Sequence, residues 1–175
     1  GVIHPNAVRK ALTPETKLVS IGWANNEIGV VQPLHAIAEA LRAYEKEHGI
    51  HIIFHTDAGQ APLYLKSTVH GLGVDLMTLD SGKLYGPRGI GMLFVRRGVS
   101  ITPIMHGGGQ EKGIRPGTEN VALVAGFSSA LLACATEREE ETKRLSKLRA
   151  HFIDALKQAI PDAAVQLSLL WYQKV

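Results

Sequence analysis

Strand-like and helix-like segments alternate along the first hundred residues, and this order constrains the fold more than any other feature. Four short runs rich in apolar and β-branched residues are strand candidates: residues 17–24, 50–56, 74–79 and 91–97. Between the first two, residues 34–48 carry apolar side chains at helical spacing, and Gly49 ends that pattern. Strands joined through a helix favour a βαβ unit, so we predict an α/β fold with a mainly parallel sheet and flanking helices.

The second half of the chain reads as a loop followed by a long helix. Residues 106–117 are rich in glycine and polar side chains, which predicts an exposed loop. Residues 119–160 follow with helical periodicity. We expect two apolar stripes on that helix, one made of Val121, Val124, Phe127, Leu131 and Cys134 and the other of Leu145, Leu148, Phe152 and Leu156.

Composition and charge argue against several classes of protein. The net charge is only +3, and the cations are scattered, so we expect no nucleic-acid partner. A single cysteine, Cys134, excludes an internal disulfide. We find no secretory signal pattern and no stretch approaching the ~20 apolar residues that span a bilayer, so we expect a cytoplasmic protein without a membrane partner.

Polar side chains follow each of the first three strand candidates. Asn26 follows the first, Asp57 and Gln60 follow the second, and Lys83 follows the third. In open α/β sheets, ligands bind beyond the carboxyl ends of the strands. We therefore expect these four side chains to share one edge of the sheet.

Four blocks of sequence resemble the cysteine desulfurases, the NifS/IscS-like group of enzymes with the class V aminotransferase fold. They are WANNEIGVVQP (23–33), FHTDAGQAP (54–62), GVDLMTLDSGKLYGPRGIGMLFV (73–95) and HGGGQEKGIRPGTEN (106–120). The resemblance covers residues 1–165 and implies part of the large domain of a fold type I transferase that depends on pyridoxal 5'-phosphate (PLP). It also implies that residues 1–135 belong to this PLP-binding domain. Residues 136–175 would then be a helical connection and the start of a truncated C-terminal small domain.

The resemblance implies a role for each polar residue at the sheet edge. Lys83 matches the catalytic lysine that holds PLP as a Schiff base and moves protons, although a lysine at a turn is usually a surface residue. Asp57 matches the carboxylate that pairs with the pyridinium nitrogen, with an Asx turn as the structural alternative. Gln60 would hydrogen-bond the phenolic oxygen, or cap a loop. Asn26 would lie beside the ring, or serve only the Asn-Asn turn.

Two residues of the fourth block imply a homodimer. Thr118 matches a threonine that reaches across the dimer interface to the PLP phosphate of the other subunit. The alternative is a helix N-cap, and the two roles are compatible. Arg115 would be an interface or phosphate-side cation, or else form a surface salt bridge.

The block around Lys83 departs from the family pattern. The family usually has serine and histidine at the positions of Asp80 and Gly82, and both bind the phosphate. Because a carboxylate beside a phosphate is repulsive, we expect Asp80 to point elsewhere and Ser81 to donate in place of the lost hydroxyl. Cys134 lies on an apolar helical stripe, so we expect it in the core and not as the family's nucleophile.

The family's phosphate loop and ring-stacking histidine lie upstream of these blocks, and its nucleophilic cysteine and substrate-binding arginine lie downstream. Since we find none of them in residues 1–175, we expect this chain alone to be inactive or nearly so. The expected parent activity converts L-cysteine to L-alanine and passes the sulfur to an enzyme cysteine, with a sulfur-acceptor or scaffold protein as a further partner.

The residues leave two alternatives open and argue against a third. A selenocysteine lyase or another class V aminotransferase would share the same residues, and a non-catalytic dimerising fragment would keep only the dimer surface. A phosphate-binding module is disfavoured, because a Walker loop ending at Lys83 needs glycine at 77 and serine or threonine at 84, where Met77 and Leu84 stand.

Overall fold

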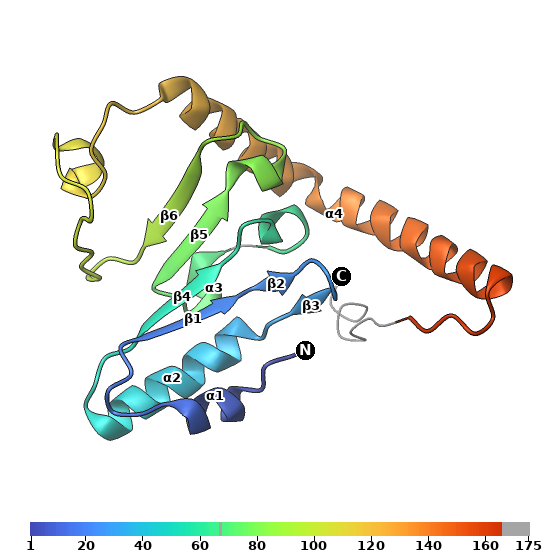
Figure 1. Cartoon of the computed structure of the whole chain (residues 1–175), viewed down its shortest axis with the longest axis horizontal. Coiled ribbons are helices and arrows are strands. Elements are labelled where there is room, and N and C mark those ends of the chain that lie inside the picture. Colours follow the sequence, from blue (N-terminus) through green and yellow to red (C-terminus); the bar gives the residue numbers. More distant parts are fainter. Residues whose placement is uncertain (67, 166–175) are drawn as a thin grey trace.

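A four-stranded sheet forms the centre of the molecule. The computed structural model describes residues 1–66 and 68–165. In the order β1-β4-β5-β6, the strands are Leu18–Gly22, Ile53–Asp57, Leu76–Asp80 and Gly91–Val95 (Figure 1). β1, β4 and β5 are parallel, whereas β6 returns antiparallel to β5. The predicted α/β fold with a mainly parallel sheet is confirmed, and the direction of β6 is a feature that the sequence pattern had not indicated.

The first strand candidate is divided into two strands. β1 ends at Gly22, and β2 (Ala24–Asn25) forms a separate antiparallel pair with β3 (Val30–Val31). Trp23 joins the two sheets, because its N–H donates to the Asp57 carbonyl (2.8 Å) and its own carbonyl accepts from the Gln32 N–H (2.8 Å). The β2–β3 hairpin is thereby fixed beside the carboxyl end of β4.

Two helices lie along one side of the sheet near the start of the chain. α2 spans Leu34–His48, the predicted bounds, and Gly49 ends it in the left-handed conformation (φ 65°) that glycine adopts without strain. α1 (Pro5–Ala11) packs against α2 and was not predicted from the sequence. The shorter helical segments are η1 (Ala61–Leu63), α3 (Val69–Leu72), η2 (Ser81–Leu84) and η3 (Gln110–Gly113).

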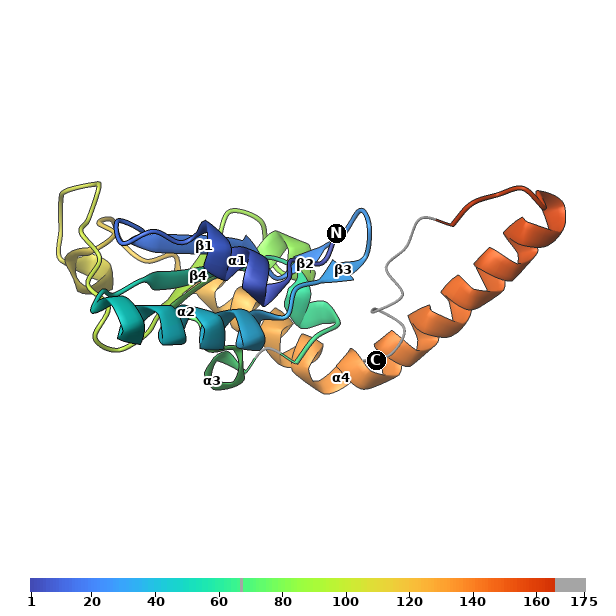
Figure 2. The same cartoon turned by 90° about the horizontal axis from the view of Figure 1, so that it is seen from below.

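The core lies between one face of the sheet and the helices. β4 and β5 alternate in burial, as strands with one covered face do, so Phe54 and Met77 point into the core. The apolar side of α2 and residues Phe127 and Cys134 of α4 belong to the same cluster. Figure 2 shows α2 and the first half of α4 on the same side of the sheet. On the opposite face, Leu18 of β1 is 57% exposed. Parallel sheets are normally covered on both faces.

The last element, α4, is a single helix of 39 residues from Val121 to Ala159. Its N-cap is Asn120, whose side chain accepts the Leu123 N–H at 3.2 Å. Because α4 runs without interruption through residue 135, no boundary of the fold coincides with the expected division into 1–135 and 136–175. That division stays a prediction, and residues 166–175 of its second part lie outside the described residues.

The two apolar stripes expected on α4 are only partly buried. Phe127 and Cys134 are buried, but Val121 is 75% exposed and Phe152 is 64% exposed. By length and composition an 18-residue window of α4 is apolar enough to cross a membrane, contrary to our reading of the sequence, although one such helix is weak evidence. Only 11% of that window is buried, so most of its residues are uncovered by the part of the chain that is described.

An ionic cluster around Asp75 aligns β5 with β4. The Asp75 carboxylate accepts the Phe54 N–H (2.9 Å) and an Arg42 N–H (2.6 Å), and it lies 3.2 Å from Nε of Arg96. The backbone N–H of Asp75 donates in turn to the Phe54 carbonyl at 2.7 Å. Asp75 is 4% exposed. This cluster fixes where β5 begins, and therefore where its carboxyl end meets that of β4.

Candidate functional site

An amine and a carboxylate meet at the carboxyl edge of the sheet. Asp57 is the last residue of β4, and Lys83 lies in η2 directly after β5. Both side chains lie against Gly59, where a Cβ would be 3.2 Å from Asp57 Oδ1 and 3.6 Å from Lys83 Nζ. The separation of Asp57 Oδ1 and Lys83 Nζ therefore cannot exceed the sum of these two distances. His55, two residues before Asp57, shares a hydrogen bond of 2.8 Å with the Ser20 hydroxyl on the neighbouring strand.

A small cavity of about 90 Å³ surrounds this pair. Its lining comes from the end of β1, the hairpin, the β4–η1 turn and η2: Gly22, Ala24, Asn26, Asp57, Ala58, Gly59, Gln60, Ala61 and Lys83. All four polar residues expected at the sheet edge line this one cavity. The expectation that they lie together is confirmed, whereas their roles toward a cofactor stay predictions.

The local hydrogen bonds test the structural alternatives for these residues. Asn25, not Asn26, makes the turn, because its Oδ1 accepts the N–H groups of Glu27 (2.9 Å) and Ile28 (3.0 Å). Gln60 stands before η1 but makes no side-chain cap bond. Asp57 does form the Asx-type contact, since its Oδ1 accepts the Gly59 N–H at 2.9 Å. The amides of Asn26 and Gln60 are thus not committed to the turns beside them.

The residues just before Lys83 do not form the expected phosphate-binding group. Asp80 accepts the Gly82 N–H at 2.9 Å, which confirms that its carboxylate is engaged within its own turn. The Ser81 hydroxyl is fully buried without a hydrogen-bond partner, and a Cβ at Gly86 would lie 2.3 Å from it. It does not line the cavity around Lys83. The proposal that Ser81 replaces the lost hydroxyl therefore does not fit this arrangement, because η2 turns that side chain into the protein.

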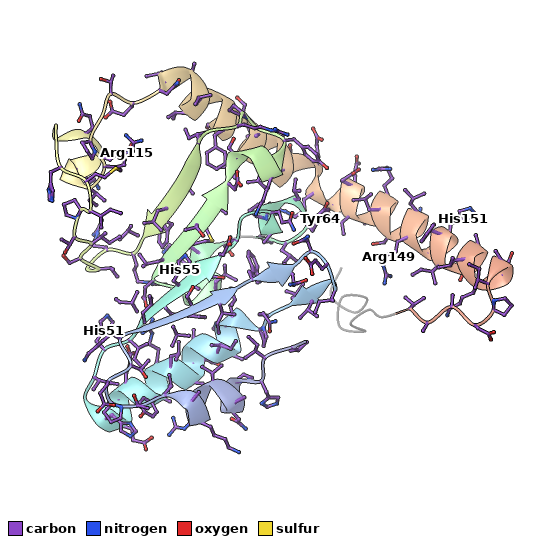
Figure 3. All side chains as sticks on the ribbon, in the orientation of Figure 1. His51, His55, Tyr64, Arg115, Arg149 and His151 are labelled. Carbon is purple, nitrogen blue, oxygen red and sulfur yellow. The ribbon has the colours of Figure 1, made fainter. Side chains whose placement is uncertain are left out.

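Thr118 and Arg115 lie on the connection that leads into α4, away from the Lys83 cavity. Neither residue lines the Lys83 cavity, and both are exposed. Asn120 takes the N-cap position that was an alternative role for Thr118. Arg115 donates to the carbonyl of the adjacent Pro116 at 2.5 Å and projects from the loop in Figure 3. A role for Thr118 across a dimer interface stays a prediction.

A larger cavity of about 700 Å³ adjoins the first and was not foreseen from the sequence. Ala24, Asn26, Gln60 and Ala61 line both, while the outer wall comes from the second half of α4 through residues such as Leu148, Arg149 and Phe152. Figure 3 shows Tyr64 and Arg149 on the two sides of this region.

The Tyr64 phenol lies in the wall of the larger cavity, and its pKa is raised. Burial is the main cause, and the neighbouring Tyr85 and Glu141 add to it. No periodicity or motif singles out Tyr64 or Arg149, because the first follows a short turn and the second is a single cation beside the apolar Leu148 and Phe152 on α4.

Cys134 packs beneath η2 and does not line the Lys83 cavity. It is 8% exposed, its thiol lies 3.9 Å from the Leu84 carbonyl, and burial raises its pKa. The expected core position is confirmed. Within residues 1–66 and 68–165, no group of three or more His, Cys, Asp or Glu side chains could hold a metal ion.

The donor set at the sheet edge fits the ring of PLP better than its phosphate. An amine that can attach an aldehyde, a carboxylate for a pyridinium nitrogen and two uncommitted amides line one cavity. The same edge presents a carboxylate at Asp80, a buried hydroxyl at Ser81 and no side chain at Gly82. The side chains that line the cavity therefore suit the ring and the aldehyde chemically, whereas Asp80, Ser81 and Gly82 offer no side-chain donor to a phosphate.

Comparisons of sequence and fold relate the chain to known proteins. Residues 1–167 match the family described as aminotransferase class-V. The chain is 40% identical over 162 residues to "Cysteine desulfurase IscS" of Dictyoglomus turgidum. Among solved structures it resembles "NIFS-LIKE PROTEIN" with a TM-score of 0.88 and 33% identity, and "SspA in complex with cysteine" with a TM-score of 0.66 and 39% identity.

These matches cover most of this chain but less than half of each relative. The match to the Dictyoglomus protein includes 93% of this chain and 40% of that protein. The corresponding shares are 97% and 45% for the NifS-like structure, and 74% and 36% for the SspA complex. The chain thus spans about two fifths of the length of the curated relatives that it matches.

Proposed function

The chain belongs to the class-V aminotransferase family, and from that premise we propose that it is part of a PLP-dependent cysteine desulfurase. The proposed reaction removes sulfur from L-cysteine, leaves L-alanine and passes the sulfur to an enzyme cysteine for Fe–S cluster or thio-cofactor synthesis. The names of the relatives and the cysteine-bound SspA neighbour support the choice of substrate.

One observation carries the proposal. The Lys83 amine and the Asp57 carboxylate lie against the same backbone position, Gly59, in a cavity that Asn26 and Gln60 also line. Within the described part of the chain, the Lys83 amine makes no hydrogen bond or ion pair. An uncommitted amine beside a held carboxylate is the arrangement that a pyridine aldehyde requires.

Each residue has a task that follows from its position. When bound, PLP supplies an electron sink for the electron pair left at the substrate Cα. Asp57, oriented by the Gly59 N–H, keeps a proton on the ring nitrogen. Lys83 attaches the cofactor and then takes up and returns a proton at Cα. The amides of Asn26 and Gln60 orient the ring and its phenolic oxygen.

We also propose that the protein is a homodimer whose contact surface includes the exposed apolar residues around the start of α4. Tyr85 is 85% exposed, and Val121, Val124 and Leu132 are 75%, 49% and 66% exposed. Large exposed apolar patches are typical of interaction sites. A membrane would cover these residues equally well. Size-exclusion chromatography with light scattering, run with and without detergent, distinguishes a dimer from a membrane-binding chain. The proposal requires a detergent-independent dimer that Leu132→Lys weakens.

A chimaera tests the activity itself. The 162-residue segment of the Dictyoglomus enzyme would be replaced by the matching segment of this chain, so that the rest of a complete desulfurase is present. We expect sulfide release from L-cysteine that Lys83→Ala abolishes. A chimaera that binds PLP but releases no sulfide would contradict the proposed reaction. The unmodified 175-residue chain serves as the control and should release little or none.

A further inference from the structure

The space beside Gly82 is occupied by an arginine from the next turn. A side chain at position 82 would place its Cβ 3.5 Å from Arg88 Cγ and 3.4 Å from Asp80 Oδ1. The stem of Arg88 therefore runs past the position from which a side chain at 82 would project. Arg88 reaches this place from the connection between η2 and β6.

The turn that carries Arg88 is firmly attached to η2. The Gly86 N–H donates to the Ser81 carbonyl at 2.9 Å, and the Ser81 N–H donates to the Ile90 carbonyl at 3.2 Å. Gly86 lies so close to Ser81 that a Cβ there would overlap the hydroxyl at 2.3 Å. The backbone on both sides of Arg88 is thus bound to the segment that contains Lys83, which leaves only the arginine side chain to move.

The charge of Arg88 is not used within the described residues. Arg88 is exposed, and no hydrogen bond or ion pair of its guanidinium occurs in residues 1–66 and 68–165. The nearby Asp80 carboxylate is engaged by the Gly82 N–H instead. An uncommitted guanidinium is suited to bind a phosphate, because its N–H groups match two oxygens at once.

Resting on the function proposed above, we propose that Arg88 binds the phosphate of the cofactor from the space beside Gly82, which its own stem occupies in the absence of a side chain at position 82. The structure favours this assignment because Asp80 and Ser81 offer no donor at the same edge, and because Arg88 lies next to the residue before Lys83. The cation also offsets the repulsion between the Asp80 carboxylate and a phosphate dianion. Arg88 thereby completes a site whose ring-binding half is formed by Asp57, Gln60 and Lys83.

Comparison of two aldehydes isolates the contribution of the phosphate. Binding of PLP and of pyridoxal, which lacks the phosphate, is measured by calorimetry on the 175-residue chain. The change in the ratio of the two dissociation constants between variants reports phosphate recognition, because the hemiacetal that free pyridoxal forms affects every variant equally. We expect Arg88→Ala to reduce the preference for PLP about tenfold, the effect of one charge-assisted hydrogen bond, and Arg88→Lys to retain part of it.

Two further variants complete the design. Arg97→Ala removes an equally exposed cation just after β6 and should leave the preference for PLP unchanged. Gly82→His in the Arg88→Ala background should restore part of the preference, because it supplies another donor at the same position. An Arg88→Ala variant that keeps the full preference for PLP would overturn the assignment of Arg88.

The outcome for Arg88 can be separated from that for the proposed function. Lys83→Ala should abolish covalent attachment of both aldehydes, whereas Arg88→Ala should leave attachment of pyridoxal intact. If neither aldehyde binds the unmodified chain, the proposed function fails. In that case inorganic phosphate is titrated while the Arg88 Nε–H signal is followed by NMR. A saturating shift that Arg97 does not show supports the phosphate site, and no shift refutes it.

Discussion

Replacing Asp75 by alanine should destabilise the fold and weaken the candidate site together. The Asp75 side chain is 5% exposed and serves three groups: the Phe54 N–H, Arg42 and Arg96. The pKa of Arg42 is raised, because its hydrogen bonds to Asp75 and Glu45 outweigh the opposing effect of burial. The Arg42 charge therefore contributes to stability throughout the accessible pH range.

The expected loss of unfolding free energy depends on which partners of Asp75 stay buried after the carboxylate is removed. Phe54 is fully buried, so its N–H loses its acceptor at a cost of about 1–2 kcal/mol. The side chains of Arg42 and Arg96 are 36% and 39% exposed, so water replaces much of the lost ion pairing, and we expect the two pairs together to contribute about 1 kcal/mol. We expect Asp75→Ala to lower the free energy of unfolding by about 2–3 kcal/mol. Asp75→Asn, which keeps an acceptor, should cost about half as much.

Urea unfolding followed by circular dichroism measures these differences. The matched control is Glu141→Ala, which breaks an ion pair with Arg144 on the exposed surface of α4 and should have no measurable effect. Because Asp75 sets the position of β5 on β4, Asp75→Ala should also weaken PLP binding. If Asp75→Ala unfolds at the same urea concentration as Glu141→Ala, the account of this cluster is wrong.

The remaining predictions concern a thiol and two glycines. Burial raises the pKa of Cys134, so alkylation at neutral pH should be slow in the folded chain and rapid in urea. The contribution of the buried thiol to stability should be lost as the pH rises past about 8.5, where the thiol of the unfolded chain ionises. Gly49→Ala should cost about 1 kcal/mol in thermal unfolding, because φ is 65° and the space around it is open. Gly73→Ala should cost more, since at φ 73° its Cβ would also lie 2.6 Å from Ala38 Cβ; equal costs would refute the steric argument.

Local sequence signals predicted the elements that depend on local interactions. The bounds of α2 were predicted correctly because its apolar spacing ends at Gly49, whose positive φ stops the helix. The position of the polar residues at one sheet edge was also predicted correctly, because the carboxyl ends of parallel strands lie on the same side of a sheet. α1 was missed because seven residues that begin at Pro5 contain too few apolar positions to show a period.

Features that depend on packing between distant segments could not be predicted. The burial of the Ser81 hydroxyl follows from the close approach of Gly86, which no local pattern encodes. The exposure of Val121 and Phe152 on α4 reflects where the rest of the fold covers that helix. The larger cavity likewise arises only when α4 passes the β2–β3 hairpin, so Tyr64 and Arg149 carried no signal of their own.

The central claim is that the amine at position 83 is the one that meets a pyridine aldehyde beside Asp57. Mixing the chain with one equivalent of PLP, reducing with borohydride and mapping the peptides by mass spectrometry tests it directly. The account predicts that the label concentrates on Lys83 and falls sharply there in Asp57→Ala. A label spread evenly over exposed lysines such as Lys10 and Lys112, or unchanged in Asp57→Ala, would contradict it.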